Sequence, residues 1–240
     1  MATQWVKQGR TELYVPSEQG TDTFVYPAVG PNTYAEVGRG IIQQRLKRPT
    51  FSQTSALVHK AFQQLKEEPK DVYALEIKDK MRTDWFWGFT RLLWTPEGVY
   101  GYDGPKDVVR GKRYLKAQLG RKEINDVVYS EDGNVRYVSR KSKFFRLGEQ
   151  EPSNLESNAV VRVMGKESSG AQLAFVAAQY KFNPSVFGVK LSKGQKSEQR
   201  VSALGKKWYN DDRLYVIGGA DGNYGDGYAF GVDAPQKNFE

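Results

Sequence analysis

Two stretches near the start of the chain have apolar residues at helical spacing. In the first, Thr33 and Glu36 form a capping box, in which both side chains accept hydrogen bonds from free amides of the first helical turn. Apolar residues follow at positions 37, 41 and 46, and residues 47–49 end the pattern with a proline. In the second, Thr50 and Gln53 form another capping box before apolar residues with a period of 3.6 up to residue 65. The pattern predicts two early helices.

Most other apolar residues lie in short runs that are typical of β-strands. The first runs are 13–15 and 23–26. The aromatic run 85–94 is separated from 99–102 by Thr-Pro-Glu-Gly, which predicts a hairpin. A second hairpin is predicted around Glu-Asp-Gly-Asn at 131–134, between the runs 127–129 and 135–138.

The second half of the chain ends in predicted strands. Residues 114–119 fit a short helix, and 171–178 fit either a helix or a strand. Four closing strands are predicted at 186–191, 201–204, 213–217 and 228–232. The predicted fold class is therefore α+β, with two early helices and mainly antiparallel strands. No repeat or linker divides the chain, so residues 1–240 are predicted to form one domain.

The C-terminal segment has a composition found nowhere else in the chain. Between positions 209 and 227, 14 of 19 residues are Gly, Asp, Tyr or Asn. Tyr supplies rigid contact area, and Asn, Asp and Gly supply adaptable polar contacts, as in antibody recognition loops. The composition indicates a recognition surface, although a Gly-rich turn region that closes a β-domain has the same composition.

Alternation along the closing strands predicts which side chains face the core. Leu214 and Val216 alternate with Tyr215 and Ile217, and positions 228, 230 and 232 are also apolar. Because successive strand residues point to opposite faces, Leu214, Val216 and Phe230 are expected in the core. Tyr215 and Ile217 are then expected to point outward, and an exposed Ile beside an exposed Tyr is typical of a binding site.

Composition excludes several kinds of chemistry. The chain has no cysteine, which excludes disulfides, Cys-ligated zinc and cysteine nucleophiles. Its single histidine, His59, lies on the predicted polar face of the second helix, where a surface residue is expected. No signal peptide and no apolar run long enough to span a membrane are present, so the chain is expected to be cytoplasmic as synthesised.

Charge is distributed unevenly along the chain. The net charge is +8, but residues 208–240 hold six acids and two bases, so the body carries +12. The bases concentrate at 106–122, 136–146 and 190–200. A basic body attracts nucleic acid, and a nucleic-acid-binding protein that uses 106–122 and 136–146 is the main alternative function.

Motifs for metals, nucleotides and hydrolysis are weak. The chain has no phosphate-binding loop, and the Asp/Gly-rich 218–227 lacks the closing glutamate of an EF-hand, so no metal or cofactor is expected. Trp85, Trp87 and Trp94 fit a β-domain core better than a sugar-stacking platform. A carbohydrate-binding or hydrolysing protein that uses this cluster with acidic residues stays a weaker alternative.

The residues also resemble a known family. Asn32-Thr-Tyr-Ala-Glu-Val37, 48–50 and 55–58 in the body, with 203–204, 212–216 and 227–232 near the end, resemble the variable proteins of archaeal diversity-generating retroelements. The resemblance implies a C-type lectin fold of the formylglycine-generating-enzyme type, with a randomised C-terminal segment, here 205–232, that binds diverse ligands. The enzymes of that fold use cysteines, which this chain lacks, so it is expected not to be an enzyme.

In that family an error-prone reverse transcriptase randomises adenines, which limits the residues that can occur at a variable position. Randomising both adenines of an AAC codon gives Asn, Asp, Tyr, Gly, Ala, Ile and Ser among others, but never Trp, Lys, Glu, Gln or Met. The expected partners are diverse proteins or cell-surface molecules, without specific nucleic acid. The ligand-binding residues expected on this basis are Tyr209, Asn210, Asp212, Tyr215, Ile217, Ala220, Asp221, Asn223, Tyr224 and Asp226.

Overall fold

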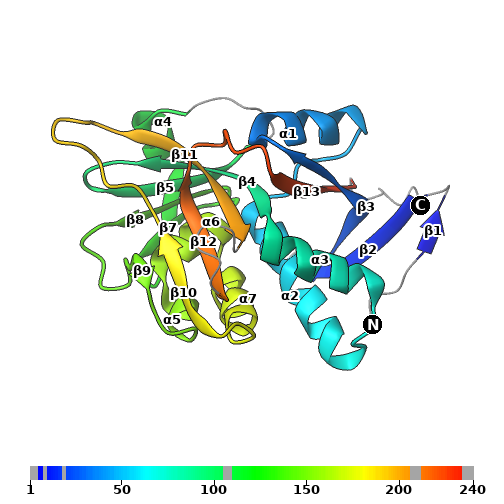
Figure 1. Cartoon of the computed structure of the whole chain (residues 1–240). Coiled ribbons are helices and arrows are strands. Elements are labelled where there is room, and N and C mark those ends of the chain that lie inside the picture. The colour runs from blue at the N-terminus through cyan, green and yellow to red at the C-terminus, as the bar shows by residue number, and fades with distance from the viewer. Residues whose placement is uncertain (1–4, 8–9, 18–19, 105–109, 206–211, 234–240) are drawn as a thin grey trace.

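The computed structural model describes residues 5–7, 10–17, 20–104, 110–205 and 212–233 (Figure 1). Within these residues, one mixed sheet of 13 strands runs through the molecule. The strands are β1 (Trp5–Lys7), β2 (Arg10–Ser17), β3 (Gly20–Asn32), β4 (Trp85–Trp94), β5 (Gly98–Asp103), β6 (Leu119–Ile124), β7 (Val127–Ser130), β8 (Val135–Ser139), β9 (Gly148–Glu149), β10 (Phe182–Phe187), β11 (Glu198–Gly205), β12 (Arg213–Ala220) and β13 (Gly227–Val232).

Strand β4 is the centre of this sheet. The main path runs β1-β2-β3-β13-β4-β11-β12-β10-β9, and β5, β8, β7 and β6 continue from the second half of β4. Pairing is antiparallel except for β13 with β4 and β10 with β12. The predicted hairpins are confirmed, with Trp94 opposite Val99 in β4–β5 and Val127 opposite Val138 in β7–β8. The α+β class with mainly antiparallel strands is therefore confirmed.

Seven helices accompany the sheet in the described part of the chain. They are α1 (Tyr34–Gln43), α2 (Phe51–Glu67), α3 (Val72–Thr83), α4 (Lys112–Gln118), α5 (Asn154–Ser157), α6 (Ala159–Gly165) and α7 (Ser168–Ala177). The two predicted early helices are α1 and α2, capped by Thr33 and by the complete Thr50–Gln53 capping box. Helices α3 and α6 were not predicted, and the ambiguous 171–178 lies mostly in α7.

The central strands are buried on both faces. On one face, Phe86, Leu214, Val216 and Phe230 share a core with apolar residues of α2, α3, α6 and α7. On the other, Trp85, Trp87, Phe89, Tyr215 and Ile217 cluster with Tyr34, Val37 and Ile41 of α1. Figure 1 shows α1 on one side of β13 and α2 and α3 on the other. The central sheet is thus the middle of three layers.

Two arginines of the predicted basic stretch 136–146 are held by other parts of the fold, Arg136 fully buried and Arg140 half-buried. Arg136 is fully buried and holds Asp103 at 2.7 Å, and its Nε donates to the carbonyl oxygen of Val163 at 2.8 Å. Arg140 donates to the carbonyl oxygens of Thr95 and Val189, each at 3.1 Å. Both guanidinium groups therefore tie the β5–β8 hairpin region to its neighbours and are not free to bind phosphate.

Candidate functional site

The C-terminal segment crosses the sheet between two strands that are not neighbours. Strands β12 and β13 are separated by β11 and β4, and the loop 221–226 joins them beside α1 (Figure 1). It starts where Ala220 pairs with Val201 and ends where Gly227 pairs with Trp85. The connection therefore lies on the α1 side of the central strands.

The base of this loop is fixed by backbone hydrogen bonds. The amide of Tyr34, the first residue of α1, donates to the carbonyl oxygen of Gly222 at 3.0 Å. Gly222 is buried against Tyr34 and Val201 with φ +84°, a conformation that glycine adopts at no steric cost. The amide of Asn223 donates to Asp221 Oδ1 at 2.9 Å, which closes an Asx turn. The loop is thus held at one point while its tip projects.

The tip presents polar and aromatic groups to solvent. Asp221, Asn223 and Gly225 are exposed, and Tyr224 is 43% exposed. Asp226 is half-buried at the end of the loop. Of the residues predicted from the sequence, the structure therefore brings Asp221, Asn223, Tyr224 and Asp226 together in one loop.

Beneath the loop lies an aromatic support that sequence analysis did not assign to the site. The ring of Tyr34 lies 4.5 Å from Phe89 and 5.9 Å, edge-on, from Trp87, centroid to centroid. Trp87 Nε1 donates to the carbonyl oxygen of Asn32 at 3.2 Å. The guanidinium of Arg91 lies 5.7 Å from the Tyr34 ring centroid. The only sequence signal for this support is the capping box that places Tyr34 at the start of α1.

The prediction that Tyr215 and Ile217 face solvent is wrong. Each is 2% exposed, and Ala220 is 5% exposed. Leu214, Val216 and Phe230 are buried as predicted. The alternation is therefore correct, but β12 is a central strand with a packed layer on each face, so the second face is also core. Tyr215 packs on Phe187, with ring centroids 5.5 Å apart.

Three other predicted residues lie away from the loop or outside the described residues. Asp212 is at the opposite end of β12, where its carbonyl oxygen accepts from the amide of Phe182 at 2.9 Å and its Oδ2 accepts from the amide of Lys181 at 3.2 Å. Tyr209 and Asn210 fall in 206–211, outside the residues that the structure describes.

The tryptophan cluster belongs to the core, as predicted. Trp85, Trp87 and Trp94 are each at most 3% exposed, so they offer no stacking platform to a sugar. Two acidic residues near this cluster in the sequence have ion-pair partners, since Glu97 contacts Lys112 at 2.8 Å and Asp103 contacts Arg136. Lys112 also holds the pKa of Glu97 down, at about 2, which keeps that carboxylate ionised.

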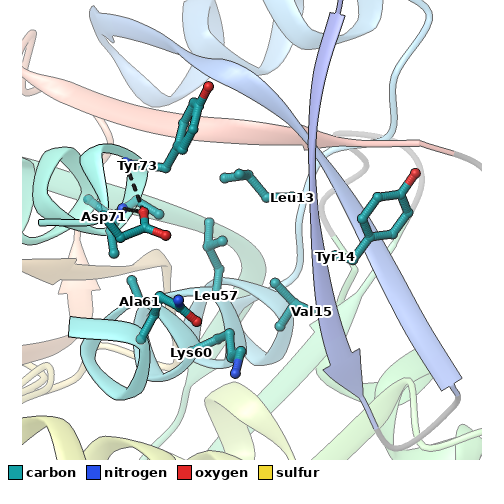
Figure 2. A pocket seen from close by; sticks show the side chains of 11 residues that line it. Leu13, Tyr14, Val15, Leu57, Lys60, Ala61, Asp71 and Tyr73 are labelled. Carbon is teal, nitrogen blue, oxygen red and sulfur yellow. Dashed lines mark hydrogen bonds between the residues drawn. The ribbon is translucent and has the colours of Figure 1, made fainter. Parts of the chain in front are cut away.

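Hollows elsewhere in the molecule are less suited than the loop 221–226 to contact a ligand. Figure 2 shows an apolar pocket in which Leu13 and Val15 of β2 point toward Leu57 of α2, below Tyr73 of α3. Its volume of about 40 Å³ is far below that of pockets for organic ligands. A groove of about 520 Å³ lies near the start of α2, where Gln53 already bonds Asp22 and Asp132 already bonds Ser130.

Fold and site together define an α+β protein with a long mixed sheet and a polar C-terminal loop anchored beside its first helix. Among the helices of the described residues, none is both long and apolar enough to cross a membrane. No protein-family model matches the sequence, and no curated protein matches it.

A comparison with solved structures found similarity to a chain described as "Accommodation of massive sequence variation in Nanoarchaeota by the C-type lectin fold". The TM-score is 0.47 and the identity 15%, over 86% of this chain and 96% of that chain.

Proposed function

We propose that this chain is a non-enzymatic ligand-binding protein whose C-terminal segment is diversified by a retroelement and displayed on a C-type lectin-like domain. One observation carries the proposal: the loop 221–226 has a buried, hydrogen-bonded base at Gly222 and an exposed polar and aromatic tip. Recognition loops on rigid scaffolds share this arrangement, because the scaffold folds independently of the tip.

The residues that we propose to contact a ligand are fewer than the predicted residues that a randomised AAC codon can encode. It consists of Asp221, Asn223, Tyr224 and Asp226, all of which an AAC codon can reach. Tyr215, Ile217 and Ala220 are equally reachable but are buried, so we place them in the support of the site. The loop carries two carboxylates, an amide and a tyrosine, which fit basic or hydrogen-bonding groups on a protein or another cell-surface molecule.

The genomic locus of the chain tests this proposal. We expect a near-copy of the last coding segment and a reverse transcriptase gene beside it. Copies of the gene from one population should differ at adenine-derived positions in codons 221, 223 and 224. Codons 214, 216 and 230, which encode core residues, serve as the matched control and should stay constant. Differences spread evenly over both sets, with no nearby template copy, would contradict the proposal.

A further inference from the structure

A second exposed surface, on α4 and the strand that follows it, has the opposite charge to the loop. Residues 110–122 contain six bases and no acid. We call this the α4 basic surface: Arg110, Lys112, Arg113, Lys116, Arg121 and Lys122. All but the half-buried Arg110 are exposed. Five of these six bases lie on one short helix and the strand that follows it, which also carries one acid, Glu123.

Several bases on this surface lie at helical spacings at which like charges repel one another. Lys112 and Lys116 are four residues apart on α4, and Arg113 and Lys116 are three apart, spacings at which like charges destabilise a helix. Lys112 has a carboxylate partner in Glu97. Arg113, Lys116 and Arg121 have no ion pair with any residue that the structure describes. An anionic partner would therefore remove repulsion that the fold leaves in place.

An aromatic ring and a hollow lie beside these charges. Tyr114 is 46% exposed, and the guanidinium of Arg110 lies 4.5 Å from its ring centroid. Arg110 is itself fixed, because its amide donates to the hydroxyl of Tyr102 at 3.3 Å and its carbonyl oxygen accepts from Gln199 Nε2 at 3.1 Å. The hollow, of about 330 Å³, is lined by Tyr102, Tyr114 and Gln118 and also by the carboxylates of Asp103 and Asp132, which are already bonded to Arg136 and Ser130, so the phosphate groups are expected to lie on the exposed bases outside it.

Two kinds of polyanion carry the charge that such a surface attracts, an acidic membrane and a nucleic acid. The packing of α4 favours the nucleic acid. A helix that inserts into the surface of a membrane needs exposed apolar side chains. On α4 the apolar anchor Leu115 is fully buried, within a cluster that includes Tyr100 and Tyr102. Phosphate groups, in contrast, need only the exposed cations, and an exposed Tyr beside an Arg can stack on an unpaired base.

We infer that the α4 basic surface binds the phosphate backbone of single-stranded nucleic acid without sequence preference, and that Tyr114 stacks on a base. This surface is separate from the C-terminal loop and does not depend on the function proposed for it. Arg136 and Arg140, which the sequence placed among the candidate bases, are left out of this surface because their guanidinium groups already donate to backbone carbonyl oxygens.

Fluorescence anisotropy of a labelled, mixed-sequence single-stranded oligonucleotide at low salt tests the inference. The test variant changes Arg113, Lys116, Arg121 and Lys122 to Gln. The control changes Lys181, Lys190, Lys193 and Lys196 to Gln, which removes the same charge from exposed positions elsewhere. We expect a loss of affinity of tenfold or more in the test variant and less than threefold in the control. The slope of log affinity against log salt concentration should also become shallower by about 0.7 for each phosphate that the test variant no longer neutralises.

The stacking role has its own pair of variants. Tyr114→Ala should weaken single-strand binding about fivefold or more, while Tyr114→Phe, which keeps the ring, should bind like the wild type. Binding to a duplex should depend less on Tyr114 than binding to the single strand. Equal losses in the two four-residue variants would show attraction by net charge alone and overturn the inference. Binding to phosphatidylserine vesicles but not to the oligonucleotide would overturn it in favour of a membrane surface.

Discussion

At the scale of single residues, Gly225 of the C-terminal loop and Gly227, the first residue of β13, have opposite roles. Gly227 lies directly against the indole of Trp87, so a Cβ there would overlap the ring. A Cβ at Gly225 would meet no atom within 4 Å. We therefore expect Gly227→Ala to lower the free energy of unfolding by about 1–3 kcal/mol, and Gly225→Ala to change it by less than about 0.5 kcal/mol. Urea unfolding of the two variants measures both, and equal losses would contradict this description of the loop.

The residue-level features that could be predicted from sequence are those that depend on nearby residues. The Thr50–Gln53 capping box forms as predicted because both of its hydrogen bonds lie within one helical turn. The exposure of Tyr215 could not be predicted, because it depends on α1 and on strands far away in the sequence. Three residues of the predicted ligand-binding set, Tyr215, Ile217 and Ala220, are therefore buried, and the binding role of the segment stays a prediction.

At the scale of elements, the contact between α2 and α7 is expected to depend on pH. His59 of α2 lies edge-on to Phe175 of α7, with ring centroids 4.9 Å apart. Burial, and then the charge of Lys60, lower the pKa of His59 below its ordinary value. Because the unfolded chain then binds a proton more readily, the free energy of unfolding should be highest above about pH 6.5 and fall as the pH drops below that value.

Replacement of His59 isolates this contribution, since the chain has no other histidine. In His59→Gln, the decrease in the free energy of unfolding between about pH 7.5 and 5.5 should be smaller than in the wild type. Urea unfolding at both pH values provides the comparison. Parallel decreases in the two proteins would show that His59 titrates alike in the folded and unfolded states.

Helices α3 and α6 show why some elements could not be predicted. Residues 159–165 are rich in valine, which favours strands, yet they form α6. Asn158 caps this helix, because its Oδ1 accepts from the amides of Val160 and Val161. Helix α3 buries only Ala74, Ile77 and Met81. This apolar stripe is narrow, and the many charged residues of the helix obscure it in the sequence. In α6 tertiary packing outweighs local preference, whereas α3 consists largely of good helix formers and is capped by Asp71.

At the scale of the whole molecule, the three-layer arrangement separates the residues that stabilise the fold from the residues that we propose to contact a ligand. The central strands are covered by α1 on one face and by four helices on the other, so their side chains stabilise the fold. The loop 221–226 lies at the edge of this arrangement, fixed at Gly222 and exposed beyond it. The proposed function depends on this separation, because the side chains of a display surface must change without loss of the fold.

The most direct test is the thermal stability of two matched sets of variants. One set exchanges Asp221, Asn223 and Tyr224 together for other residues that an AAC codon can encode, and the other exchanges only Tyr215 for the same residues. Phe230→Ala, a core truncation expected to cost about 3–5 kcal/mol, is the reference. We predict cooperative melting near the wild-type temperature for most loop variants, and losses approaching the reference for the Tyr215 variants. Loop variants that melt as low as Phe230→Ala would show that the segment is structural and would contradict the account.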